Sequence, residues 1–188
     1  MTDSAAAIFL AYFTAALVVA WLVFSYNRLV RRRNLVKEGW SGIDVQLKRR
    51  HDLVPNLVET VRGYADFERS VLEDVTRLRS EAEGGQAPGE LVNTENALAG
   101  RIRTLFALAE DHPQLLANRS FLDLQKQLTE VEDHLQYARR YYNGAVRDLN
   151  IAVESFPSNL VAGVFRFRTA EFFEVESATD RAAPEVSL

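Results

Sequence analysis

The feature that most constrains this chain is a long uncharged stretch near its N-terminus. No Asp, Glu, Lys or Arg occurs between Asp3 and Arg28, and most residues there are Ala, Val, Leu, Ile, Phe or Trp. A helix of about 20 such residues is long enough to cross the hydrocarbon core of a bilayer. A cleaved secretory signal is the alternative, but the acidic start and the end, WLVFSYN, do not fit its pattern. We expect an external N-terminus at residues 1–4 and a retained transmembrane anchor at residues 5–26.

The charge that follows the stretch predicts its orientation. Residues 27–50 are rich in Lys and Arg, whereas residues 1–4 contain neither. Because Lys and Arg next to a span stay on the cytoplasmic side, we expect a single-pass protein of the cytoplasmic (inner) membrane, with its N-terminus outside and the bulk of the chain in the cytoplasm. A basic segment beside an otherwise acidic chain favours anionic lipid head groups over nucleic acid. The predicted head-group contacts are Arg28, Arg31, Arg32 and Arg33.

Beyond the anchor, apolar residues recur at steps of three and four, which predicts helices rather than strands. The first three expected helices carry Val36–Leu47, Leu53–Leu78 with a stop at Gly84 and Gly85, and Leu91–Leu108 with an end before Pro113. The fourth has the strongest pattern, a coiled-coil-like seam from Phe121 to Phe156. It predicts a helix about 53 Å long, capped by Ser120 and ended by Pro157.

Four amphipathic helices with short connections predict an all-α protein, in which an antiparallel (up-and-down) four-helix bundle over residues 27–156 follows the transmembrane helix. Residues 157–176 form a Phe-rich C-terminal extension, and residues 177–188 are expected to be a disordered tail. Whether the extension caps the bundle or moves freely remains open at this point.

The stretch KRRHDLVPNL, residues 48–57, is interpreted as a structural corner between the first two helices. Lys48, Arg49 and Arg50 would lie in the last turn of one helix, where cations meet the negative end of the macrodipole. Asp52 would cap the next helix, and Pro55 would lie in its first turn. The alternative is a single helix kinked at Pro55. The corner cations are expected to approach the acidic residues before Pro113.

No catalytic, cofactor-binding or metal-binding residue is assigned. The chain has no cysteine, no Gly-rich phosphate loop followed by Lys and Ser or Thr, and no pair of histidines at helical spacing. A site formed by His51 and His112, for a metal or for pH sensing, is an alternative.

Several segments also resemble the LemA family of bacterial membrane proteins. They are YNRLV (26–30), GWSGIDVQLKRRHDLVPNLVETVRGYADFE (39–68), YYNGAVRDLN (141–150) and SFPSNLVAGVFRF (155–167). Gly39 departs from the family's usual Ala, and Phe67 from a common His. The resemblance implies an N-terminal anchor and a cytoplasmic antiparallel four-helix bundle, and it brings no catalytic residues. It also suggests a partner, since genes of such proteins often accompany those of TPM-domain proteins or a membrane zinc metalloprotease.

Three functional hypotheses follow. The first is a membrane-anchored interaction or scaffold protein, because the fourth helix outruns the third and leaves a partner groove at Tyr142, Leu149 and Phe156, unless the Phe-rich extension folds back over it. The second is a lipid-coupled scaffold that assembles with its own copies as a homo-oligomer. The third, a metal-dependent enzyme, depends only on the scattered histidines and acids.

Overall fold

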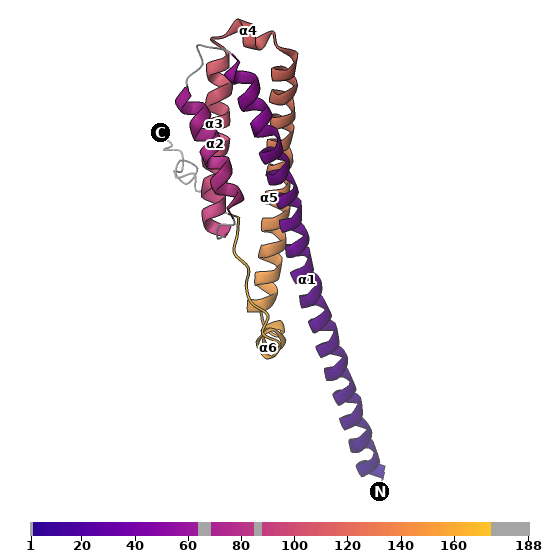
Figure 1. The fold of residues 1–188 in the computed structure, drawn as a ribbon. Helices are drawn as coiled ribbons and strands as arrows, with labels where there is room; N and C mark the ends of the chain where they lie inside the picture. The colour runs from indigo at the N-terminus through magenta and orange to yellow at the C-terminus, as the bar shows by residue number, and fades with distance from the viewer. Residues whose placement is uncertain (1, 64–68, 85–87, 174–188) are drawn as a thin grey trace, which may run out of the picture. The chain divides into compact units, whose positions relative to one another are not determined.

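The computed structural model describes residues 2–63, 69–84 and 88–173, and every regular element in these ranges is a helix (Figure 1). The helices are α1 (Thr2–Arg62), α2 (Arg69–Glu83), α3 (Pro88–Ala109), α4 (Pro113–Leu116), α5 (Arg119–Glu154) and α6 (Ser158–Val164). The all-α class is therefore confirmed. The expected tail at residues 177–188 lies outside the described residues.

The predicted corner at residues 48–57 is wrong, because α1 continues through it without a break. Lys48, Arg49, Arg50 and Asp52 lie inside the helix, and Pro55 is an exposed interior residue. A proline inside a helix costs about 3 kcal/mol. The buried seam of α1 offsets this cost, since each fully buried aliphatic side chain contributes about 1.5–3 kcal/mol. The seam on both sides of the proline consists of Ile43, Leu47, Val54, Leu57 and Val61.

A side chain from another helix also replaces the backbone hydrogen bond that is missing at Pro55. Proline has no N–H, so it cannot donate to the carbonyl four residues earlier, which belongs to His51. That carbonyl instead accepts a hydrogen bond of 2.8 Å from Nε of Arg79 on α2. The acceptor left free by the proline is thereby satisfied, which explains how α1 keeps its course.

The expected second helix over Leu53–Leu78 is divided between α1, which ends at Arg62, and α2, which begins at Arg69. The remaining helix ends agree with the sequence more closely. α2 ends immediately before Gly84, as predicted, and the 36 residues of α5 nearly match the expected fourth helix. Its cap is Asn118 rather than Ser120, because Oδ1 of Asn118 accepts hydrogen bonds from the backbone N–H groups of Ser120 (2.9 Å) and Phe121 (3.3 Å). The single turn of α4 was not predicted; Pro113 occupies its first position.

The chain forms two compact units, which we describe separately. The anchor unit comprises residues 1–41 and 140–172, and the core unit comprises residues 42–139 and 173–188. The core unit is built around one apolar cluster to which α1, α2, α3, α4 and α5 all contribute. Leu57, Val75, Leu105, Leu115 and Phe121 are fully buried in it. This cluster is the source of most of the unit's stability.

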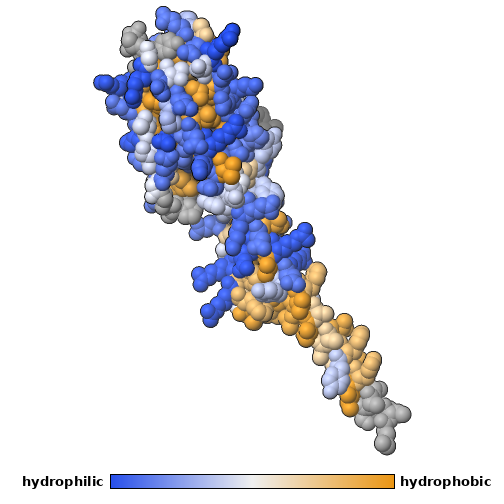
Figure 2. Space-filling model, turned by 45° about the vertical axis from the view of Figure 1, so that its right-hand side comes forward, coloured by the Kyte–Doolittle hydropathy of each residue, from blue (hydrophilic) through white to orange (hydrophobic). Residues whose placement is uncertain are grey.

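The anchor unit carries the uncharged stretch. Large apolar side chains along α1 from Ile8 to Phe24 are exposed, and Figure 2 shows the resulting hydrophobic surface along this part of the helix. Among the described residues, α1 is the helix that is long and apolar enough to cross a membrane. Just beyond the stretch, Leu29 of α1 packs with Ala152 of α5 and with Val161 and Ala162 of α6.

Within the anchor unit, the residues that follow α5 fold back on α1 and α5. Tyr26 contacts Phe165 and Phe167, with ring centroids 4.8 and 5.8 Å apart. The side chain of Asn150 forms two hydrogen bonds with the backbone of Ala170, one from Nδ2 to the carbonyl (3.0 Å) and one from the backbone N–H to Oδ1 (2.8 Å). The extension, as far as Ala170, therefore packs against α1 and α5 of the anchor unit.

Helices α1 and α5 approach closely at Gly39 in the anchor unit. A Cβ atom at this position would lie 3.0 Å from Cα of Tyr142 and 3.2 Å from the ring of Tyr141. The nearer atom belongs to the backbone of α5, so it cannot move aside as a side chain could. Trp40 packs beside this point, with its ring centroid 5.6 Å from that of Tyr142. The close approach therefore requires a residue with very little side chain.

We expect Gly39→Leu to lower the free energy of unfolding by about 1–3 kcal/mol, because the added side chain would overpack against α5. Gly42→Leu is the matched control, since the nearest atom to its Cβ is the side chain of Ala138 at 4.0 Å. The control should be neutral or slightly stabilising, because leucine has the higher helix propensity. Chemical denaturation of the full-length protein in mild detergent, followed by circular dichroism, measures both. Equal effects would contradict the close approach.

Candidate functional site

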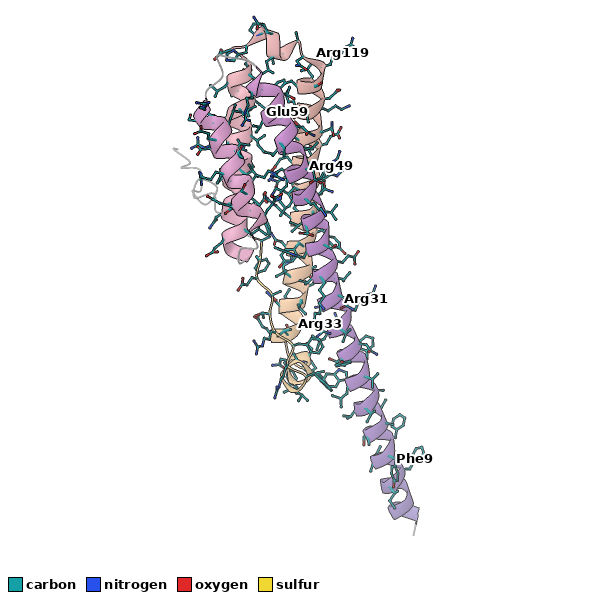
Figure 3. The ribbon with its side chains drawn as sticks, in the orientation of Figure 1. Phe9, Arg31, Arg33, Arg49, Glu59 and Arg119 are labelled. Carbon is teal, nitrogen blue, oxygen red and sulfur yellow. The ribbon has the colours of Figure 1, made fainter. Side chains whose placement is uncertain are left out.

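The arginines predicted to contact lipid head groups lie in the anchor unit and differ in their surroundings. Figure 3 shows Arg31 and Arg33 on α1, beyond the apolar stretch marked by Phe9. Arg33 lies over the ring of Phe167, with 5.1 Å between its guanidinium carbon and the ring centroid. Arg32 donates a hydrogen bond to the backbone carbonyl of Asp148. Arg28 and Arg31 are exposed.

The residues predicted to line a partner groove do not form one open surface. Tyr142 and Leu149 are buried, whereas Phe156 lies beyond the end of α5 and is 79% exposed. The hydroxyl of Tyr142 donates a hydrogen bond of 2.9 Å to the backbone carbonyl of Glu171. The C-terminal segment therefore covers this part of the α5 seam, which is the exception that the groove hypothesis allowed.

The sequence did not predict the cluster of buried charges inside the core unit. Arg50 is 2% exposed and Glu95 is fully buried, and His51 and Arg139 are buried as well. Nη1 of Arg50 lies 3.2 Å from Oε2 of Glu95, and its Nη2 pairs with Glu132. Nε2 of His51 lies 2.6 Å from the other carboxylate oxygen of Glu95. Both oxygens of the buried carboxylate are thus paired, and two arginines face two glutamates.

These residues occupy positions at which the seams call for apolar side chains. Arg50 follows Leu47 by three residues and precedes Val54 by four, and Glu95 lies three residues before Leu98. Arg139 lies four residues after Leu135 in α5. The periodicity of the sequence could therefore have predicted these buried charges, because a charged residue that continues the three- and four-residue spacing of the apolar residues lies on the buried face of its helix. Arg50 and Arg139 are opposite in sign to Glu95 and Glu132, and such pairing is the condition for burying charges.

Arg139 is the least well satisfied member of the cluster. Its Nε is buried and has no acceptor among the described residues, while Nη2 lies 3.4 Å from Oδ1 of Asn96. Its guanidinium lies over the ring of Phe173, 4.7 Å from the centroid. Burial lowers the pKa of Arg139 below its ordinary value, and the positive charge of Arg50 acts in the same direction. The aromatic contact and Glu132 partly compensate the buried charge.

A cavity of about 190 Å³ in the core unit adjoins the cluster. Arg50 and Glu132 belong to its lining, the exposed Arg103 contributes as well, and the remaining wall is largely apolar. That wall consists of Ala99, Ile102 and Phe106 of α3 together with Leu128 and Thr129 of α5. The site thus offers a small, largely apolar recess lined also by an ion pair between the buried Arg50 and the half-exposed Glu132.

The alternative of a histidine metal site gains no geometric support. Within the described residues, no three His, Cys, Asp or Glu side chains are grouped so that they could hold a metal ion. His51 is engaged with Glu95, and His112 precedes the short helix α4. The corner cations also pair elsewhere than expected: Arg49 lies 3.9 Å from Glu130, and Arg50 meets Glu95 and Glu132.

We expect Arg50→Met to lower the free energy of unfolding by about 3–5 kcal/mol, because it would leave the buried Glu95 without its main cation. The matched control is Arg49→Met, whose ion pair with Glu130 is exposed on both sides and contributes about 1 kcal/mol or less. The double variant Arg50→Met/Glu95→Leu should recover much of the loss. Denaturant titrations of the four proteins measure this, and similar costs at residues 49 and 50 would contradict a buried pair.

Burial, with a contribution from Glu171, raises the pKa of the Tyr142 hydroxyl above its ordinary value of about 10. The folded protein therefore holds this proton more tightly than the unfolded chain does. Its contribution to stability is present below about pH 10 and is lost as the pH rises further.

We accordingly expect the stability of the wild type to fall above about pH 10. Tyr142→Phe should flatten part of this dependence, because phenylalanine has no proton to lose. Denaturation midpoints on either side of that pH measure it, with the exposed Tyr141→Phe as the matched control. Identical pH profiles for Tyr142→Phe and the wild type would rule out the assignment.

Comparison with known proteins places this architecture in a family. The chain is similar to protein LemA of Metamycoplasma hominis, at 25% identity over 160 residues, which cover 82% of this chain and 72% of the relative. It is also similar to magnetosome protein MamQ 2 of Paramagnetospirillum magneticum, at 24% identity over 191 residues (86% of this chain, 69% of the relative). Magnetosome protein MamQ of Magnetospirillum gryphiswaldense is 21% identical over 189 residues (86% and 69%). The family model of the LemA family matches residues 39–188, which is most of the chain, and the protein therefore belongs to the LemA family.

Proposed function

We propose that the protein is a single-pass membrane-anchored interaction protein, with its N-terminus outside and an antiparallel four-helix bundle that binds a partner at the cytoplasmic face. The observation that carries this proposal is the composition of α1. One unbroken helix supplies both the exposed apolar stretch and the buried seam of the core unit. An anchor helix that continues into the folded bundle suits a protein that presents a binding surface beside a membrane. The proposed activity is therefore binding rather than catalysis.

The proposed docking surface is the recess between α3 and α5 in the core unit. Ile102, Phe106 and Leu128 line it, so it suits one apolar side chain of a partner helix. Arg103 is exposed in its lining and would favour an acidic residue beside that apolar anchor. The partner class is another membrane protein, for which a TPM-domain protein or a membrane metalloprotease is a candidate.

Site-specific photo-cross-linking in intact cells tests this surface. A photoreactive phenylalanine at Thr129, which lines the recess, should cross-link to one discrete membrane protein. The matched control is Thr104, an exposed threonine on α3 that does not line the recess and should give little product. Arg103→Glu should reduce the product at Thr129 several-fold, because it reverses the charge at this position.

Two outcomes would contradict the proposal. Equal cross-linking at residues 129 and 104 would show that the recess does not select a partner. Cross-links that join only copies of this chain would instead support a lipid-coupled scaffold that forms homo-oligomers. The second outcome is a real competitor, because the exposed arginines and apolar stretch of α1 also suit an assembly on anionic membrane.

A further inference from the structure

A second cavity lies in the anchor unit, where the apolar stretch of α1 gives way to basic residues. Its volume is about 240 Å³. Trp21 and Phe24 line it from the apolar stretch, and Arg28 and Arg32 line it one to two turns further along the same helix. The opposite wall comes from the end of α5 and the start of α6, including Ser155 and Phe156. One cavity is thus apolar at one end and cationic at the other.

The charge of this cavity is not balanced by its own lining. Two arginines contribute to the wall, and no Asp or Glu does. Arg32 is oriented by its hydrogen bond to the carbonyl of Asp148. Arg28, four residues earlier on the same helix face, pairs with no acid among the described residues. An anion placed between these two guanidinium groups would therefore be stabilised.

The short helix α6 adds exposed apolar side chains beside the cavity. Val161 and Ala162 pack inward against Leu29, whereas Leu160 and Val164 on the same helix are exposed. Phe156, just before α6, is 79% exposed and lines the cavity. An apolar surface of this kind beside a transmembrane stretch suits the boundary between head groups and acyl chains.

Aromatic residues lie at the same position along α1, where the apolar stretch meets the basic segment. Tyr26, at the end of the apolar stretch, packs against Phe165 at the end of α6. Tyrosine is enriched where a membrane meets water. The start of the basic segment, α6 and the cavity therefore coincide with the interface that the bilayer would have if α1 spans it.

We propose that this cavity binds one anionic phospholipid from the leaflet that faces the bundle. The phosphate lies between Arg28 and Arg32, and an acyl chain follows Trp21 and Phe24 into the bilayer. Phe156 and Leu160 then lie in the boundary region of the same leaflet. A soluble phosphate would leave the apolar half of the cavity unfilled, and a zwitterionic lipid would bring a cation to a site without a carboxylate. The inference depends on the proposed function in one respect, namely that α1 spans the membrane.

Lipid retention by the full-length protein tests the proposal. The protein is reconstituted in nanodiscs of phosphatidylcholine and phosphatidylglycerol, released into mild detergent, and examined by native mass spectrometry. The wild type should retain one phosphatidylglycerol in preference to phosphatidylcholine. Arg28→Gln/Arg32→Gln should lower the ratio of lipid-bound to lipid-free protein by about tenfold or more, because each charged hydrogen bond lost is worth about that factor.

The matched control is Arg31→Gln/Arg33→Gln, which removes the same charge from the same segment but from residues outside the cavity. It should retain the lipid as the wild type does. Equal losses in the two double variants would show diffuse attraction to anionic membrane and would overturn the site. Ser155→Leu provides a second test, since it fills the cavity without changing the charge; it should lower retention too, and wild-type retention in this variant would also overturn the site.

Nanodisc incorporation separates the two proposals. A wild-type protein that does not enter nanodiscs refutes the membrane anchor and, with it, the lipid site. A protein that enters nanodiscs but retains no phosphatidylglycerol, or retains it equally in all variants, refutes the lipid site alone. Circular dichroism of each variant in detergent establishes that it is folded, and Ser155→Leu decides the question if the arginine variants are not.

Discussion

The buried carboxylate of Glu95 is the interaction on which the arrangement of the core unit depends. Its two oxygens are held by Arg50 and His51, so α3 is tied to α1 by charged hydrogen bonds rather than by apolar contact alone. Arg50 also reaches Glu132 on α5. A small shift of one helix along another costs little where the contact is apolar. The same shift is costly where it would leave a buried charge without its partner. The cluster therefore joins one turn of α1 to one turn of α3 and one turn of α5, at a desolvation cost that the surrounding apolar cluster must offset.

The course of α1 illustrates how tertiary contacts overcome a local preference. Proline is a helix breaker in the interior of a helix, and the charges before Pro55 fit a helix end equally well. The apolar steps from Leu47 to Val61 continue across it, and their burial decides the outcome. Arg79 supplies the hydrogen bond that the proline cannot make. A basic residue on a neighbouring helix is thus part of what makes the proline tolerable.

The sequence was sufficient for the elements that depend on periodicity and insufficient for those that depend on single polar contacts. Leu128, Leu135 and Leu149 are buried as their spacing predicts, because a continuous apolar stripe on a helix is removed from water only when that face packs against other helices. The buried cluster was missed because charges are expected outside, although Arg50 and Glu95 occupy seam steps. The sequence left open whether the Phe-rich extension folds back over α5. Periodicity could not decide this, because the hydrogen bonds of Asn150 and Tyr142 go to backbone carbonyl groups, which are present in every residue.

The unbroken helix through Tyr26, Leu29 and Gly39 has a consequence for the exposed apolar stretch of α1. A helix turns by about 100° per residue, so the buried position of Leu29 fixes the direction of every side chain in the apolar stretch of the same helix. The direction in which each side chain of the apolar stretch points is thus set by the packing of residues beyond the end of that stretch. A rotation of α1 against α5 in the anchor unit would therefore turn the whole apolar stretch by the same angle, because the two segments belong to one continuous helix.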